Sequence, residues 1–245
     1  MVRPFRCDFH IHTCLSPCAD LDMYPTALVR ESVARQIDII GICDHNASEN
    51  AGFVMRAAEG TPLVVFPGME VTSSEEVHVC ALFGNITQLM ELQKTVYESL
   101  TGVNNENLFG SQVIVNERDE VEGYNERLLI GATGLSLRNI IDAVHALDGI
   151  AIASHIDREY FSVLGQLGFI PPDVGFDALE ITWRTGIRTA RSLYPELAAF
   201  PFITSSDAHR LHDIGTGAFC AFLDAPTIDE LRKALTGFDG RKLEE

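Results

Sequence analysis

The sequence has little positive charge. Lysine and arginine together number 18, against 35 aspartate and glutamate residues, so the formal net charge is −17 over 245 residues. Lysine itself occurs only at Lys94, Lys233 and Lys242. A surface this acidic repels phosphate backbones, which argues against a long nucleic acid as the main partner.

Long apolar runs are also missing. No stretch approaches the roughly 18 apolar residues of a membrane-spanning helix, and residues 1–8 form no apolar secretory core. We therefore expect a cytoplasmic protein. Hydrophobic residues make up 46% and charged residues 22% of the chain, which is typical of a folded globular protein and excludes a disordered one.

The six cysteines contain no Cys-x-x-Cys pair. Four of them, Cys7, Cys43, Cys80 and Cys220, lie within apolar runs, where a free thiol behaves as a small hydrophobe. The other two, Cys14 and Cys18, stand beside a histidine motif. A disulfide or thiolate role for these two stays open, but we expect bystander thiols.

Short apolar runs alternate with helix-length segments along the chain. Seven runs are predicted strands, and most are continuously apolar, as in parallel sheets that are covered by helices on both faces. The predicted strands are 5–12, 37–43, 63–71, 77–83, 150–155, 178–182 and 202–206, and the predicted helices are 25–36, 86–100, 137–147, 184–199 and 227–235. This alternation predicts an α/β fold, and seven strands favour a (β/α) barrel over an open doubly wound sheet.

A polar segment at about 101–136 interrupts this alternation. It is rich in asparagine and glutamate, and the apolar runs 113–115 and 128–130 on either side of Gly123 predict a hairpin. A loop this long in a compact domain is usually a lid, a binding loop or disordered. A functional lid and a solvated insertion therefore both stay open.

Polar side chains cluster where the predicted strands end. The segments at these positions are Asp8-Phe9-His10-Ile11-His12, Asp44-His45-Asn46, Gly68-Met69-Glu70, His78, Ser154-His155 and Ser205-Ser206-Asp207-Ala208-His209. They contain six of the eight histidines. In a barrel, side chains at the carboxyl ends of the strands converge on one mouth, where such enzymes work.

This set of residues predicts a metal centre. His10 and His12 lie two residues apart on a strand, so both imidazoles face the same way and can hold one ion. The candidate metal ligands are His10, His12, Asp20, His45, Glu70, His78, His155, Asp207 and His209. Because one ion takes about four to six ligands, this set predicts two or three divalent ions, and its nitrogen and oxygen donors favour Zn, Mn or Fe.

The ordered motifs resemble the PHP (polymerase and histidinol phosphatase) family. The resemblance covers Asp-x-His-x-His at the first strand, Asp-His at the second, a glutamate closing the third, separate histidines and a final Asp-x-His. It runs from Asp8 to His209. It implies a distorted (β/α)7 barrel that forms a single domain over residues 1–245, with a di- or trinuclear site that hydrolyses phosphate esters.

The resemblance also implies a place for each ligand. His10, His12, Glu70 and Asp207 match the first metal position. Glu70, as a bridge, matches the second position together with His78 and His155.

Asp20, His45 and His209 match the third position. Asp20 stands five residues before Pro25, as the family acid does, but the loop before it is longer than usual and Asp22 competes with it. Glu70, His78, Asp207 and His209 are the candidate catalytic residues.

Asp8 and Asp44 fit a supporting role, because metal-bound histidines commonly donate their other N–H to a carboxylate. A plain structural hydrogen bond is the alternative for each.

We expect hydrolysis of a small phosphorylated metabolite or nucleotide by metal-activated water, with in-line attack on phosphorus. Arginine is the usual phosphate clamp. The candidates are Arg158, Arg184, Arg210 and, in the insertion, Arg127, with Arg184 and Arg210 as first choices. A surface salt bridge is the alternative for each of them.

Three other functions stay open. An amidohydrolase barrel also begins with His-x-His, but many of these enzymes use a carboxylated lysine, and no lysine ends a strand here. A 5′–3′ exonuclease-type enzyme would act on short oligonucleotides, although the chain lacks a basic groove with interleaved aromatic residues. A non-catalytic PHP regulatory module would be expected to have lost ligands, whereas this set is complete.

Overall fold

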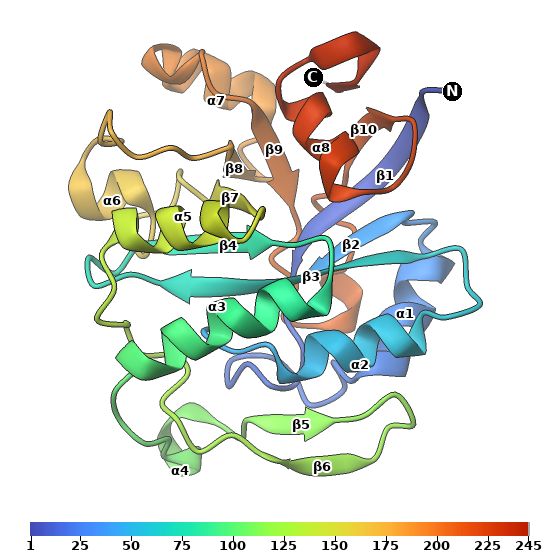
Figure 1. Cartoon of the computed structure of the whole chain (residues 1–245), viewed down its shortest axis with the longest axis vertical. Coiled ribbons are helices and arrows are strands. Elements are labelled where there is room, and N and C mark those ends of the chain that lie inside the picture. The colour runs from blue at the N-terminus through green and yellow to red at the C-terminus, as the bar shows by residue number, and fades with distance from the viewer. Residues whose placement is uncertain (245) are drawn as a thin grey trace.

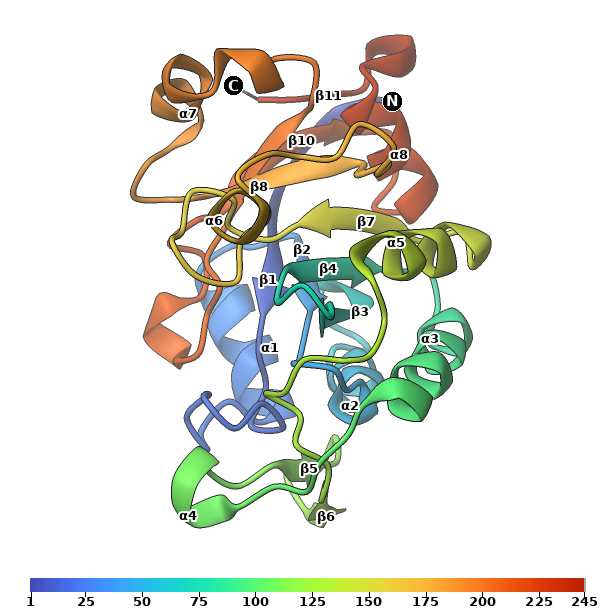
Figure 2. The same cartoon turned by 90° about the vertical axis from the view of Figure 1, so that its left-hand side faces the viewer.

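The computed structural model describes residues 1–244. A nine-stranded sheet runs in the order β11-β10-β1-β2-β3-β4-β7-β8-β9 and curves round on itself (Figures 1 and 2). Its strands are β1 (Arg3–Ile11), β2 (Ile39–Ile42), β3 (Val64–Thr72), β4 (His78–Leu82), β7 (Ile150–Ala153), β8 (Ala178–Thr182), β9 (Phe202–Ser205), β10 (Phe219–Leu223) and β11 (Lys242–Leu243). The seven strands predicted from sequence are all present, and β10 and β11 are additional.

Two backbone hydrogen bonds bring the ends of the seven-stranded part together. His12 donates its amide to the carbonyl of Ala208 (3.0 Å), and Ala208 donates its amide to the carbonyl of His10 (3.2 Å). The segment after β9 thus pairs with the end of β1, and the sheet becomes a nearly closed barrel. The predicted distorted α/β barrel is confirmed.

The sheet is parallel only in part, so the expectation of a parallel sheet is wrong for β4. This strand is antiparallel to β3 and to β7. The five residues of segment 73–77 connect β3 to β4, whereas a parallel crossover needs about a dozen. His78 therefore begins its strand, and the reversal of β4 places it at the rim where the other strands end.

Helices cover the outside of the barrel. They are α1 (Pro25–Ala34), α2 (Glu49–Ala57), α3 (Ile86–Ser99), α5 (Leu137–Ala146), α6 (Val163–Leu167), α7 (Ile187–Leu193) and α8 (Ile228–Leu235). Sequence analysis missed α2 and α6. The helix expected over 184–199 is shorter, because Pro195 cannot donate the amide that would continue α7, and a 3₁₀ turn (Pro195–Leu197) follows.

An irregularity in β1 turns the histidines inward. Phe9 packs in the cluster that fills the barrel, whereas Ile11, two residues on, packs in the cluster beneath the helices. Since side chains normally alternate along a strand, this change requires a break in the pattern. The register with β2 shifts between Asp8 and Ile11, and His10 and His12 follow Phe9 on the inner side.

The polar insertion is ordered and includes α4 (Glu106–Phe109). Its hairpin joins β5 (Val113–Val115) to β6 (Val121–Tyr124), so the expectation that 128–130 forms the second strand is wrong. The chain reverses within the five residues 116–120, so β5 pairs with residues 121–124 and not with 128–130. In both views the hairpin lies at the end of the molecule opposite the two termini (Figures 1 and 2).

No helix among residues 1–244 is both long and apolar enough to cross a bilayer.

Candidate metal centre

A cavity of about 480 Å³ opens at the rim where β2, β3, β7 and β9 end and β4 begins. It is lined by Cys18, His45, Glu70, His78, Ile130, His155, Arg158, Glu159, Tyr160, Phe161, Asp207 and His209. Six of these are predicted metal ligands from five different strands or strand ends. The expected convergence on one mouth is therefore what the structure shows.

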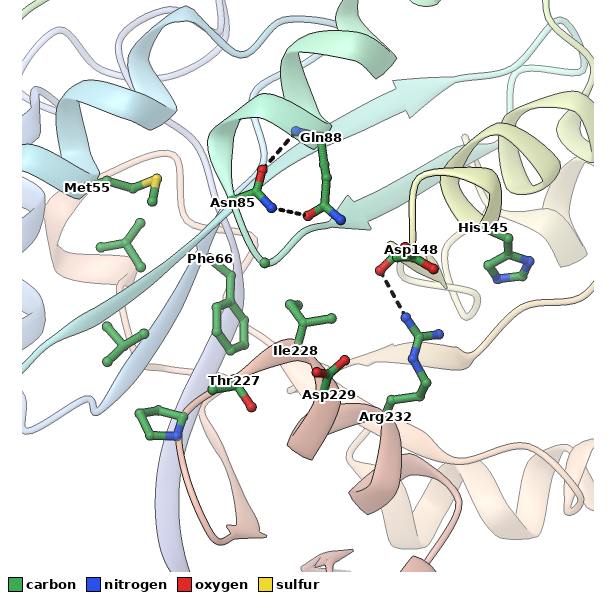
Figure 3. A pocket seen from close by; sticks show the side chains of 14 residues that line it. Met55, Phe66, Asn85, Gln88, His145, Asp148, Thr227, Ile228, Asp229 and Arg232 are labelled. Atoms are coloured by element: carbon green, nitrogen blue, oxygen red, sulfur yellow. Dashed lines mark hydrogen bonds between the residues drawn. The ribbon is translucent and has the colours of Figure 1, made fainter.

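A larger hollow of about 820 Å³ lies among the start of β3, the beginnings of α3 and α8, and the end of α5 (Figure 3). Two pairs of its polar groups bond to each other: Asn85 donates to Gln88, and Arg232 donates to the carbonyl of Asp148. Within residues 1–244, the groups of side chains suited to holding a metal all lie elsewhere. We therefore place the chemistry at the smaller cavity.

Glu70 stands at the centre of the site and is 1% exposed. Its Oε1 lies 3.2 Å from His10 Nε2 and 3.0 Å from His78 Nδ1. The same oxygen is 3.4 Å from His155 Nε2. One carboxylate oxygen thus faces ring nitrogens from three strands.

The other oxygen of Glu70 faces two further imidazoles. Its Oε2 lies 3.1 Å from His45 Nδ1 and 3.5 Å from His12 Nε2. Asp207 Oδ1 is 3.2 Å from His12 Nε2 and 3.3 Å from His10 Nε2. Two buried carboxylates and five imidazoles therefore occupy one small volume. They comprise all the residues of the first two predicted metal positions, together with His45 of the third.

The third group of donors lies on the mouth side. The nitrogens of His12, His45 and His209 lie within 4.8 Å of one another. The rings of His12 and His209 stack with their centroids 4.2 Å apart. This group contains two of the three residues that were expected at the third metal position.

Several buried atoms here have no hydrogen-bond partner among the described residues. They are Nδ1 of His45, His78 and His155, and Oε1 of Glu70. Buried polar atoms are nearly always hydrogen-bonded. Nitrogen and oxygen donors that converge without hydrogen-bonding geometry fit ligands arranged around divalent cations.

The charge states favour metal binding. Burial alone would raise the pKa of both Glu70 and Asp207. The imidazoles of His78 and His10 nevertheless hold the pKa of Glu70 well below its usual range, and the imidazole of His10 does the same for Asp207. Burial, and next His209, lowers the pKa of His12 well below its usual value. These shifts favour ionised carboxylates and a neutral His12, which are the ligating forms. At His10 and His45 burial lowers the pKa, but Cys80 and Cys18 respectively, and then Glu70, raise it well above the usual value, so an ion bound there would displace protons.

Three residues at the strand ends have left-handed backbone conformations. The φ angles are 49° at Asn46, 28° at His155 and 50° at Asp207. Non-glycine residues adopt positive φ at some cost, and such strain concentrates at functional sites. The side chain of Asn46 holds one of these turns, because it donates to the carbonyls of Leu129 and Gly131 in the insertion.

A carboxylate does support the ring of His10, but it is not that of Asp8, which was expected to accept an imidazole N–H. Asp8 instead accepts the amides of Ser206 and Gly215, a structural role. His10 Nδ1 lies 3.1 Å from Oε2 of the buried Glu180, which sequence analysis missed. The signal was a single acid inside the apolar run of β8.

Asp44 supports His12 through a hydroxyl group. Ser16 donates its Oγ–H to Asp44 (2.7 Å), and Ser16 Oγ lies 3.0 Å from His12 Nδ1. The amide and hydroxyl of Thr13 also donate to Asp44. The carboxylate thus supports the imidazole indirectly, through the hydroxyl of Ser16, whereas a direct hydrogen bond was expected.

Asp20 does not join the other ligands. Its side chain is 55% exposed and faces Arg210 at 3.6 Å. Its amide donates to the carbonyl of His209, which fixes the backbone with the side chain outside the cavity. Asp22 is exposed as well, whereas Cys18, which was expected to be a bystander, lines the cavity.

The four candidate arginines differ in their distance from the cavity. Arg158 lines the cavity and pairs with Asp207 at 2.6 Å. Arg184 lies over the ring of Trp183 in an adjoining hollow. Arg210 pairs with Asp20, and Arg127 lies over the ring of Tyr97; neither lines the cavity. The first choices, Arg184 and Arg210, therefore lie farther from the centre than Arg158.

Comparison with known proteins identifies the class of fold. The chain matches endonuclease Q from Pyrococcus furiosus, a lesion-specific endonuclease, with a TM-score of 0.78 and 18% identity over 98% of its length. It matches equally well the structure of endonuclease Q in complex with a 27-mer duplex that has an abasic lesion at the active site. No protein-family model and no curated protein sequence matches the chain.

Two further structures share the fold. A two-domain protein from Bacteroides vulgatus, containing a predicted PHP-like metal-dependent phosphoesterase, matches with a TM-score of 0.59 and 14% identity over 99% of this chain. An amidohydrolase from Chromobacterium violaceum with bound sulfate matches at 0.56 and 16%, covering 85% of this chain and 89% of its own. The chain spans 58% of endonuclease Q and 64% of the Bacteroides protein. Its fold is that of the PHP-like phosphoesterases.

Proposed function

We propose that the protein is a PHP-family enzyme that hydrolyses phosphate esters with two or three divalent ions. The observation that carries this proposal is the single buried carboxylate of Glu70, which faces five imidazoles within 3.5 Å. Ions bound by such a set lower the pKa of water and neutralise the charge on a phosphate. Zn, Mn and Fe suit its donors.

The protein contributes position and charge to this reaction. Glu70 sits between the donors of the proposed first and second positions, so it holds the two groups at a fixed separation. Glu180 orients the ring of His10, and Ser16 orients the ring of His12. Second contacts of this kind fix the tautomer and direction of a ligating imidazole.

Arg158 is the best placed residue to bind a phosphate oxygen. Its guanidinium lies at the cavity, and its side chain is 43% exposed. It can therefore release its ion pair with Asp207 and bind a phosphate of the substrate. The wall beside it is apolar: Tyr160 and Phe161 line it, and the Phe161 ring stacks on His78 at 4.8 Å. We infer a small phosphate ester whose leaving group has an apolar or aromatic face.

A second candidate substrate is the end of a nucleic acid strand. The adjoining hollow shares Arg158 with the cavity and adds Trp183 and Arg184, and a further hollow continues past Trp183 to Arg188. Aromatic and arginine side chains along one path suit stacked bases and phosphates. The fold shared with endonuclease Q supports including such substrates in the test.

The test is metal analysis together with a substrate panel. Metal-free protein is reloaded separately with Zn²⁺, Mn²⁺ and Fe²⁺, and each form is assayed on monoesters, diesters and short oligonucleotides. We expect at least two ions per chain. Since changing even outer contacts of a metal costs roughly 10–100-fold, Glu70→Gln should lower the rate by at least about 100-fold.

Glu98→Gln is the matched control, because Glu98 is an exposed glutamate on α3. It should keep the full rate and metal content. Fewer than two bound ions, or no hydrolysis of any ester with any metal, would contradict the proposed function.

A further inference from the structure

The third group of donors lacks the acid that the family pattern supplies. His12, His45 and His209 bring three ring nitrogens within 4.8 Å of one another, but Asp20 points to Arg210. Because His12 is also expected at the first position, His45 and His209 alone leave a tetrahedral third ion short of protein ligands. His45 is 6% exposed, and its Nδ1, 3.1 Å from Glu70 Oε2, makes no hydrogen bond among the described residues. The same ring belongs to both donor groups and lines the cavity beside His209.

Cys18 stands where that ligand is missing. It lines the cavity together with His45 and His209, and its thiol lies near enough to both imidazoles for them to lower its pKa. It is the only cysteine among residues 1–244 that lines this cavity.

The loop that carries Cys18 is held by its backbone. Ala19 donates its amide to the carbonyl of Ser16, and Asp20 donates its amide to the carbonyl of His209. On this loop Cys18 is exposed but lines the cavity, whereas the side chain of Asp20 lies outside the cavity and faces Arg210. The longer loop noted in the sequence therefore presents Cys18, and not Asp20, to the imidazoles.

We propose that Cys18 ligates the third divalent ion through its sulfur, with His45 and His209 as partners and in place of Asp20. This inference rests on the proposed metal-dependent function and specifies its third position. Thiolate is a soft ligand, whereas carboxylate is hard, so this position should prefer Zn²⁺ to Mn²⁺ more strongly than the positions around Glu70 do.

Cobalt spectroscopy tests this assignment directly. The full chain is loaded with Co²⁺, and bound cobalt per chain is measured together with the near-ultraviolet band that arises only from thiolate-to-cobalt charge transfer. The wild-type protein should bind three ions and show the band. Cys18→Ser should lose the band and about one ion, while the remaining ions stay bound.

Three further variants make the test specific. Cys18→Asp should regain the third ion without the band. Asp20→Asn should keep both the ion and the band. Cys220→Ser removes a thiol on β10 outside the cavity and should leave the spectrum unchanged.

Each alternative result has a distinct meaning. Two bound ions without the band, or a band that survives in Cys18→Ser, would overturn the role of Cys18 and leave the proposed function standing. Loss of the third ion in Asp20→Asn would return the ligand to Asp20. A wild-type chain that binds no cobalt would overturn both the inference and the proposed function.

Discussion

At the scale of single residues, the site depends on charged groups that are buried. Glu70 and Asp207 are buried among imidazoles that keep both carboxyl groups ionised. A buried ion pair is strongly disfavoured when one partner is removed or neutralised. The same contacts that prepare these acids for cations therefore make the metal-free protein sensitive to acid.

Acid sensitivity gives a prediction for the metal-free protein. The pKa values of Glu70 and Asp207 lie below their unfolded values of about 4, so their contribution to stability is complete above that pH. It is lost as the pH falls through about 4 and below, because the unfolded state then binds more protons. The free energy of unfolding in urea should decline over this range, and Asp207→Asn should decline less steeply.

Urea unfolding at a series of pH values is the measurement. Glu98→Gln, at an exposed position, should follow the wild-type curve. Identical pH slopes for the wild-type protein and Asp207→Asn would contradict the prediction.

At the scale of elements, the strands must approach one another closely to bring the ligands together. Gly68 lies two residues before Glu70 in β3. A β-carbon there would lie 2.7 Å from the carbonyl oxygen of Ala81 in β4 and 2.9 Å from that of Ile42 in β2. Both contacts are with backbone atoms, which cannot rotate away. β3 can therefore lie this close to β2 and β4 only because residue 68 has no side chain.

Gly68→Ala should therefore destabilise the protein and displace Glu70. Overpacking typically costs about 1–3 kcal/mol, and the midpoint of urea unfolding should fall accordingly, together with metal affinity. Gly123→Ala is the matched control, since nothing lies within 4 Å of a β-carbon at that position. Equal unfolding midpoints for the two variants would show that β3 can shift without cost.

Much of this arrangement can be predicted from the sequence, because buried strands and their terminal histidines leave local patterns. His10, His12 and Glu70 each close an apolar run, and the run alone places them at the rim. Long-range geometry leaves no such pattern. The reversal of β4, the contact of Glu180 with His10, and the exchange of Asp20 for Cys18 depend on which side of a strand or loop faces the cavity.

At the scale of the whole molecule, an acidic body surrounds a site that binds cations. The net charge of −17 repels anions over most of the surface. In the metal-free cavity the carboxylates of Glu70 and Asp207 already pair with the neighbouring imidazoles and with Arg158, so few positive groups are free to bind phosphate. Two or three divalent ions would add positive charge to this cavity and little elsewhere.

Phosphate binding should therefore depend on metal. Calorimetry with inorganic phosphate should detect binding to the zinc-loaded protein and none to the metal-free protein at the same pH and salt concentration. Arg158→Gln should weaken binding to the loaded form, and Arg30→Gln, an exposed site on α1, should not. Equal binding with and without metal would show that the arginines alone hold the anion.

The closure of the barrel also has a consequence in time. His12 and Asp207 meet at 3.2 Å across a separation of 195 residues, and contacts so distant in the chain form late and slowly. During synthesis, His10, His12, His45 and Glu70 leave the ribosome long before Asp207. A growing chain thus carries an incomplete set of metal ligands until the segment after β9 emerges with Asp207 and His209.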